Sequence, residues 1–159
     1  MIDMIVEGQP RARIVVSEID LPVERHAVTE LNKYIRQMSG VELPVATTPG
    51  DNTTNIYIGR AAPTEDIDMS EETLGFDGYI VKTIEKDIIL AGIKPYSCLY
   101  AIYHLLTRYL GCGFFEDGDQ IPQQSSVVVS KLNDVCKPRF EWRNKCVAHF
   151  SYQLYFGRY

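Results

Sequence analysis

The residues of this chain that could carry acid–base or metal chemistry are few and widely separated. The 159 residues include three histidines, at positions 26, 104 and 149, and four cysteines, at positions 98, 112, 136 and 146. No CxxC pair occurs among the cysteines, and no spacing identifies a Ser-His-Asp or Cys-His set. The sequence therefore predicts no metal site and no cofactor.

Acidic residues are common, 21 in all, so pairs of carboxylates arise by chance. Hydrolysis of a glycosidic bond requires two carboxylates that flank a bound sugar. The candidates Glu71 and Glu72, Glu116 and Asp117, and Asp119 all fall in predicted loops, where solvent surrounds a carboxylate. We therefore expect no catalytic residue in this chain.

Binding of nucleotides, nucleic acids or membranes is not indicated either. Gly111-Cys112-Gly113 follows a predicted helix, whereas a dinucleotide loop must follow a strand and open a helix. The net charge is −5, and there is no basic run of the kind that phosphate backbones attract. No stretch reaches the roughly 18 apolar residues of a membrane-spanning helix.

Aromatic residues are concentrated at the C-terminal end of the chain. Residues 140–159 contain seven of the 17 aromatic side chains. At this density, aromatic rings either bind the faces of sugars or pack against protein. The carbohydrate-contact candidates are Trp142, Tyr152 and Tyr155. The simpler interpretation, which we adopt, is that residues 144–159 lack their partner, and are disordered or associate with a second copy.

Two helices are predicted from apolar residues that recur at helical spacing. The first begins near Pro22 and ends at Gly40, with Glu30 among the residues on its polar face. The second extends from about Ser97 to Leu110. Its apolar stripe is wider than that of a surface helix, so we expect cover on more than one side.

Strands are predicted at 4–7 and 12–18, as a hairpin or two adjacent strands, and at 55–59. A hairpin is predicted at 78–84 and 87–91, and two further strands at 113–116 and 126–131, separated by a turn at 117–119. Strands and helices do not alternate strictly, so the fold class is α+β: a two-layer sandwich of a mixed β-sheet with two main α-helices packed on one face. We expect five side chains to be buried against that face: Leu31, Ile35, Leu99, Ile102 and Leu106.

The cysteines are expected to be buried thiols rather than disulfides. Cys98 and Cys112 flank the second predicted helix, which separates them by about 20 Å at ~1.5 Å per residue. A disulfide requires α-carbons within about 7 Å. We therefore predict that these two residues are not bonded to each other.

Five segments, in order, resemble the N-terminal domain of alpha-glucuronidases and related glycoside hydrolases. The similar segments are AVTELNKYIRQMSGVELPV (27–45), NIYIGR (55–60), GFDGYIVKTIEKDIILAG (75–92), CLYAIYHLLTRYLGCGFF (98–115) and PRFEWR (138–143). The resemblance implies a hexosaminidase-type accessory domain, built from a mixed sheet and two helices. In such enzymes this domain packs beside a (β/α)₈ barrel, which carries the catalytic carboxylates.

The resemblance also implies how the chain is organised. Residues 1–137 would form the accessory domain, and 138–159 would be a linker and the start of a catalytic barrel. Its partners would be that barrel and, indirectly, a glycan substrate, in a periplasmic or secreted enzyme. The candidates for contact with the barrel are Tyr100, His104, Phe140 and Trp142. The rival hypothesis is an independent carbohydrate-binding module that uses the aromatic residues near the C-terminus.

Overall fold

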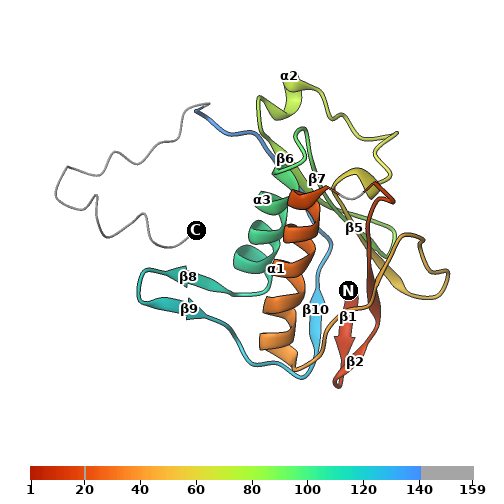
Figure 1. Ribbon diagram of the computed structural model, residues 1–159, viewed down its shortest axis with the longest axis vertical. Coiled ribbons are helices and arrows are strands. Elements are labelled where there is room, and N and C mark those ends of the chain that lie inside the picture. The colour runs from red at the N-terminus through yellow and green to blue at the C-terminus, as the bar shows by residue number, and fades with distance from the viewer. Residues whose placement is uncertain (20, 141–159) are drawn as a thin grey trace.

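A computed structural model describes residues 1–19 and 21–140 of the chain. These residues form an α+β fold in which two helices, α1 and α3, lie side by side on one face of a mixed β-sheet (Figure 1). The predicted fold class is therefore confirmed. No helix in this described part has the length and apolar character needed to cross a bilayer.

The main sheet has six strands in the order β11-β6-β7-β5-β3-β4. Four of them are parallel, because β3 pairs in parallel with both β4 and β5, and β5 pairs in parallel with β7. The hairpin β6–β7 and the edge strand β11 are antiparallel. The strands are β3 (Ala12–Val15), β4 (Val45–Ala46), β5 (Thr54–Ile58), β6 (Tyr79–Ile84), β7 (Asp87–Gly92) and β11 (Asn133–Cys136).

Helix α1 (Pro22–Ser39) begins and ends as predicted, with Pro22 in its first turn and Gly40 at φ 78° after its last. Helix α3 (Ser97–His104) continues into a π-helical segment (Leu105–Tyr109), so the second predicted helix is present but not regular throughout. These two elements supply most of the helical contribution to the core.

Four of the five predicted core side chains are fully buried: Leu31, Ile35, Ile102 and Leu106 are each 0% exposed. The prediction for Leu99 is wrong, because it is half-buried and packs at the margin of the core. The face of α3 that meets the sheet is centred on Cys98, Ala101, Ile102 and Leu105. Leu99 lies one helical position, about 100°, from that centre.

Two smaller sheets complete the fold. β1 (Ile2–Val6) lies between β10 (Val127–Val129) and β2 (Gln9–Pro10), so the first two predicted strands belong to different sheets. β8 (Gly113–Phe115) and β9 (Gly118–Gln120) form a hairpin that turns at residues 116–117. The turn predicted at 117–119 is therefore misplaced, since Gly118 already pairs with Phe115.

The second face of the main sheet is covered by a loop and one short helix. Helix α2 (Glu71–Leu74) is capped by the Ser70 hydroxyl, which accepts a hydrogen bond from the Thr73 amide at 3.3 Å. Leu74 packs there with Ile80, Ile89 and Ala91 in a second apolar cluster.

Cys98 and Cys112 are buried free thiols, which confirms that no bond joins them. Cys136 is also free and is half-buried, so the expectation of burial applies to it in part.

Candidate functional site

A groove of aromatic side chains lies on the flank of α3 and is the most distinctive surface of the described chain. It has a volume of about 420 Å³ and is lined by Tyr79, Tyr100, Tyr103, His104 and Thr107. We call it the tyrosine groove. Tyr100 is 40% exposed. An exposed aromatic surface of this kind suits contact with protein or with the face of a sugar ring.

Helical spacing places these residues together. Positions 100, 103, 104 and 107 recur at i, i+3, i+4 and i+7, which lie along one side of a helix. Tyr79 comes from the first residue of β6, which lies beneath α3. Its ring centroid is 6.2 Å from that of Tyr100 and 5.7 Å from that of His104. The groove is therefore lined by residues of both the helical region and the sheet.

Hydrogen bonds hold the floor of the tyrosine groove. His104 Nε2 lies 2.8 Å from Asp134 Oδ2, and its Nδ1 lies 3.2 Å from the Tyr79 hydroxyl. The Tyr109 hydroxyl donates to the same Asp134 oxygen at 2.5 Å. This hydrogen bond from Tyr109 lowers the pKa of Asp134 and raises the pKa of Tyr109 itself. His104 therefore has a fixed position and is 16% exposed in its side chain.

A second set of aromatic contacts secures α1 to α3 and the β8–β9 hairpin. The Tyr103 hydroxyl donates to Glu30 at 2.5 Å, and burial raises the pKa of Tyr103. The rings of Tyr34 and Tyr103 each meet Phe114 edge-on, with centroids 5.0 Å apart. Tyr34 also donates to Asp119 at 3.0 Å. The carboxylates of Glu30 and Asp119 thus each accept a hydrogen bond from a tyrosine. The prediction that Glu30 belongs to the polar face of the helix needs correction, because Glu30 contacts α3.

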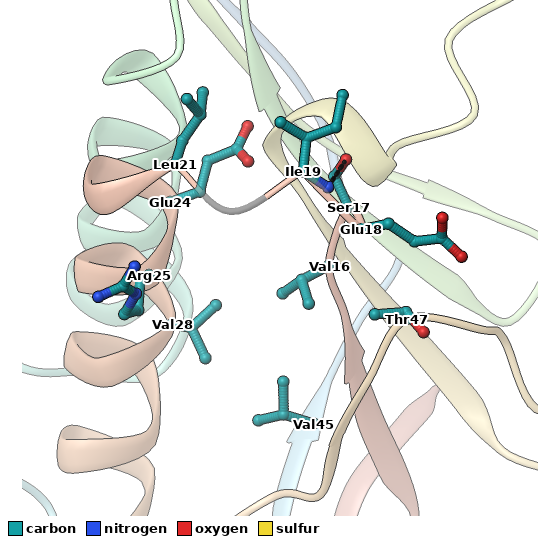
Figure 2. A pocket seen from close by; sticks show the side chains of 10 residues that line it. All are labelled: Val16, Ser17, Glu18, Ile19, Leu21, Glu24, Arg25, Val28, Val45 and Thr47. Atoms are coloured by element: carbon teal, nitrogen blue, oxygen red, sulfur yellow. Dashed lines mark hydrogen bonds between the residues drawn. The ribbon is translucent and has the colours of Figure 1, made fainter.

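A smaller, mainly apolar pocket of about 280 Å³ lies between α1 and the β3–β4 edge of the sheet (Figure 2). Its walls are formed by Val16, Ile19, Leu21, Val28 and Val45, and Glu24 lies at one end. Ser17, Glu18, Arg25 and Thr47 also line the pocket, so half of its ten lining residues, Glu24 included, are polar or charged.

Glu24 is 4% exposed and has its own partner. Its Oε1 accepts from the Arg60 backbone amide at 3.1 Å and from the Arg60 Nε at 3.3 Å. Gly59 allows this approach, because a Cβ at that position would lie 2.4 Å from the Glu24 oxygen. The turn Gly59-Arg60 therefore binds a carboxylate of the chain itself.

The carboxylates considered from the sequence are dispersed. Glu71 pairs loosely with Lys94, whose Nζ lies 3.7 Å away, and Glu116 and Asp117 occupy the turn of the β8–β9 hairpin. Within the described ranges, no group of three or more His, Cys, Asp or Glu residues is placed to hold a metal ion.

The residues proposed from the sequence fall into two groups. Tyr100 and His104 both line the tyrosine groove, and Phe140, at 70% exposed, ends the described part of the chain. Trp142, Tyr152 and Tyr155, and the whole of the 144–159 segment, lie outside the described residues. Their roles stay predictions.

Tyr79, Tyr109 and Asp134 were missed in reasoning from the sequence. Asp134 belongs to β11, a four-residue strand of which two residues, Asn133 and Asp134, are polar types that rarely occur in strands. No local signal marked the strand, because its residues do not alternate: one face has Asp134 and Cys136, and the other has Asn133 and Val135.

Comparisons with known proteins agree on the fold. No curated protein sequence matches the chain. The fold is similar to that of a family GH115 4-O-methyl-alpha-glucuronidase with specificity for decorated arabinogalactans (TM-score 0.65, 19% identity, 85% of this chain and 18% of that protein). It is also similar to the GH20 beta-N-acetylhexosaminidase from Streptomyces coelicolor A3(2) (TM-score 0.59, 16% identity, 89% of this chain and 25% of that protein). The chain thus spans a quarter or less of the length of these enzymes.

The sequence itself identifies the family. The profile described as "Glycosyl hydrolase family 67 N-terminus" matches residues 8–105, which is more than half of the chain. That range includes α1, the strands β3 to β7 and the whole of α3. The resemblance to the N-terminal domain of alpha-glucuronidase-type hydrolases is thereby confirmed, and the chain belongs to the Glycosyl hydrolase family 67 N-terminus family.

Proposed function

We propose that this chain is a non-catalytic accessory domain of a glycoside hydrolase resembling alpha-glucuronidases, which supports or shapes the active site of a barrel that follows it. The parent enzyme would act on plant or host glycans in bacterial polysaccharide degradation. Family membership and the small share of each similar enzyme that the chain spans both support this assignment.

The observation that carries the proposal is the position of the tyrosine groove beside the last strand of the domain. Cys136, the last residue of β11, pairs across the sheet with Tyr79, which lines the groove. We place the domain boundary at 137–138, directly after this strand. A structure that continues from residue 138 therefore starts next to an exposed aromatic surface.

The proposed contact residues of this interface are Tyr100, His104, Phe140 and Trp142. Interfaces are enriched in aromatic residues, because rings bury a large area while losing little conformational freedom. His104 is already held by Asp134 and Tyr79, so docking would not need to order it. Such pre-organised contacts suit a domain that keeps a neighbouring barrel in place.

An extended protein tests the interface. The coding sequence read past Tyr159 would be expressed as one polypeptide, with Tyr100→Ala as the test variant. Phe76→Ala is the matched control, because Phe76 is an exposed aromatic residue beside α2, outside the tyrosine groove. We expect Tyr100→Ala to lower the melting temperature of the extended protein more than that of the 159-residue chain. Equal effects in both proteins, or a reading frame that ends at Tyr159, would contradict the proposal.

Activity of the chain itself is a separate test. A glycosidase needs an acid and a second carboxylate roughly 5–9.5 Å apart across a bound sugar. We expect incubation of the 159-residue chain with aldobiouronic acids and aryl glycosides to release no product above buffer. Turnover that one carboxylate substitution abolishes would overturn the non-catalytic assignment.

The alternative function is an independent carbohydrate-binding module. The density of aromatic residues from 140 to 159 favours it, with Trp142, Tyr152 and Tyr155 as the contacts. Trp142 is the single tryptophan of the chain, so its fluorescence reports on one position. A saturable change in emission on addition of xylo-oligosaccharides, lost on Tyr155→Ala, would favour the module over the accessory domain.

A further inference from the structure

Cys136, His104 and Asp134 form a cluster whose thiol the proposed function does not use, although His104 is also a proposed contact residue of the interface. Strand β11 places Asp134 and Cys136 two residues apart, so their side chains emerge on the same face of the sheet. His104 of α3 lies against both. Its Nε2 is 2.8 Å from Asp134 Oδ2, and its Nδ1 is 3.7 Å from Cys136 Sγ.

This arrangement has the parts of an activated nucleophile. A base lies within reach of the nucleophile, and a third group orients the base. When the Nε2 proton is donated to the Asp134 carboxylate, Nδ1 is the acceptor of the ring, and it faces both the Tyr79 hydroxyl at 3.2 Å and the Cys136 thiol at 3.7 Å. The Tyr109 hydroxyl, at 2.5 Å, fixes the same Asp134 oxygen in turn.

We propose that Cys136 is a modification site of this chain: a thiol that reacts with small disulfides, with His104 as its base and Asp134 as the residue that positions His104. Glutathione disulfide represents the class of reagent. Cys136 is half-buried, and the tyrosine groove beside it opens at His104 and Tyr79. The residue is therefore partly exposed, and two of its neighbours line the groove.

The need for a base follows from the surroundings of the sulfur. Burial raises the pKa of the Cys136 thiol, and a hydrogen bond with Tyr79 opposes that rise in part. Little free thiolate is then present near neutral pH, although the thiolate is the attacking species. Transfer of the proton to His104 as the attack proceeds supplies it.

The step balances with the disulfide as oxidant. The Cys136 S–H proton passes to His104 Nδ1 while the sulfur attacks one sulfur of the disulfide. A new S–S bond forms at Cys136, and the original S–S bond breaks. The departing thiolate takes the proton from His104 and leaves as a thiol. Cys136 is oxidised to a mixed disulfide, and half of the reagent is reduced.

The other described cysteines serve as internal controls. Cys98 is 0% exposed and Cys112 is 5% exposed. The Cys98 thiol donates to the Pro95 carbonyl at 2.9 Å, and burial raises its pKa to about 12. We expect neither to react in the folded chain. Cys146 lies outside the described residues, so the experiment uses a Cys146→Ser background.

The experiment treats the folded chain with glutathione disulfide and follows each cysteine by peptide mass mapping. We expect one adduct, on Cys136, and a rate that falls at least tenfold in His104→Gln and clearly in Asp134→Asn. Thermal melting shows whether the variants fold. In guanidinium chloride all three chains should react at Cys136 at one common rate, because the cluster no longer exists.

Two results would overturn the inference. One is the absence of an adduct on Cys136 in the folded chain. The other is a folded His104→Gln chain that reacts as fast as its parent. If His104→Gln does not fold, the parent chain provides the test. Cys136 of the parent should then react faster in the folded chain than in guanidinium chloride, and a slower reaction would overturn the inference. Thiol modification is measured by mass mapping of the 159-residue chain, and support of a barrel by melting of the extended protein. The two proposals can therefore fail separately.

Discussion

Replacement of Leu106 by alanine tests the packing on which the whole surface of α3 depends. Leu106 is 0% exposed in the π-helical segment that follows α3. Its carbonyl accepts the Cys112 amide at 2.9 Å, which ends the helical region. Alanine keeps this backbone hydrogen bond and removes three buried carbons, so the effect reports on the apolar contacts of one side chain.

The expected loss is about 3 kcal/mol of unfolding free energy, because buried leucine-to-alanine changes cost about 2–5 kcal/mol. The surroundings of Leu106 are rigid, because α3 packs on the sheet and beside α1, so the cavity is not readily filled by collapse. In a domain of this size, each kcal/mol lost from the free energy of unfolding lowers the melting temperature by about 2–4 °C. The melting temperature should therefore fall by about 6–12 °C.

Leu99→Ala provides the matched control. The chemistry is identical and the residue lies on the same helix, but Leu99 is half-buried, so its loss should be about 1 kcal/mol. Urea unfolding followed by circular dichroism measures both variants. Equal losses for the two, or a loss below about 1 kcal/mol for Leu106→Ala, would refute the two-layer packing described for this helix.

Three further changes have defined outcomes. Gly92→Ala would place a Cβ 2.2 Å from a buried serine, so thermal melting should show a loss of about 2 kcal/mol or more; an unchanged melting temperature would contradict that contact. Arg60→Met leaves the Glu24 carboxylate without its guanidinium, so urea unfolding should show a loss of about 2 kcal/mol in the free energy of unfolding. Adding Glu24→Gln to this variant should restore part of that free energy, and no recovery would rule out an electrostatic cause. The Tyr109 hydrogen bond lowers the pKa of Asp134 in the folded chain, so its stabilisation is complete above the unfolded value of about 3.9 and is lost as pH falls below it. Melts from pH 6 to pH 2 should therefore converge for the parent and Asp134→Asn, and parallel curves would refute the shift.

The elements that the sequence predicted correctly are those with strong local signals. Helix α1 has a helical apolar pattern between a proline and a glycine, and the hairpin β6–β7 has two apolar runs around a two-residue turn. Helix α3 was located for the same reason. In these elements the local pattern and the tertiary packing favour the same structure.

The elements that were missed depend on partners elsewhere in the chain. β11 forms because β6 supplies its hydrogen bonds, with Val135 opposite Ile80 and Cys136 opposite Tyr79. Its own sequence, with Asn133 and Asp134, favours a turn over a strand. β1 joins β10 across more than 100 residues, so no local pattern could assign these two strands to a separate sheet.

The candidate site was partly hidden for a related reason. Helical periodicity shows which side of α3 leaves the sheet, and Tyr100 and His104 both lie on that side. It does not show what meets that side. Asp134 comes from a strand 30 residues later in the chain, and Glu30, which binds Tyr103, comes from 73 residues earlier.

These long-range contacts provide hydrogen-bond partners for the polar atoms of aromatic side chains, namely the Tyr79 and Tyr103 hydroxyls and the ring nitrogens of His104. A tyrosine that is free in solution must lose rotamer freedom when it is buried by a partner. In the tyrosine groove, the hydroxyls of Tyr79 and Tyr103 are already held by His104 and Glu30, and Tyr100 rests against two other rings. These contacts order the surface in the chain itself, which would lower the entropic cost of the docking proposed above.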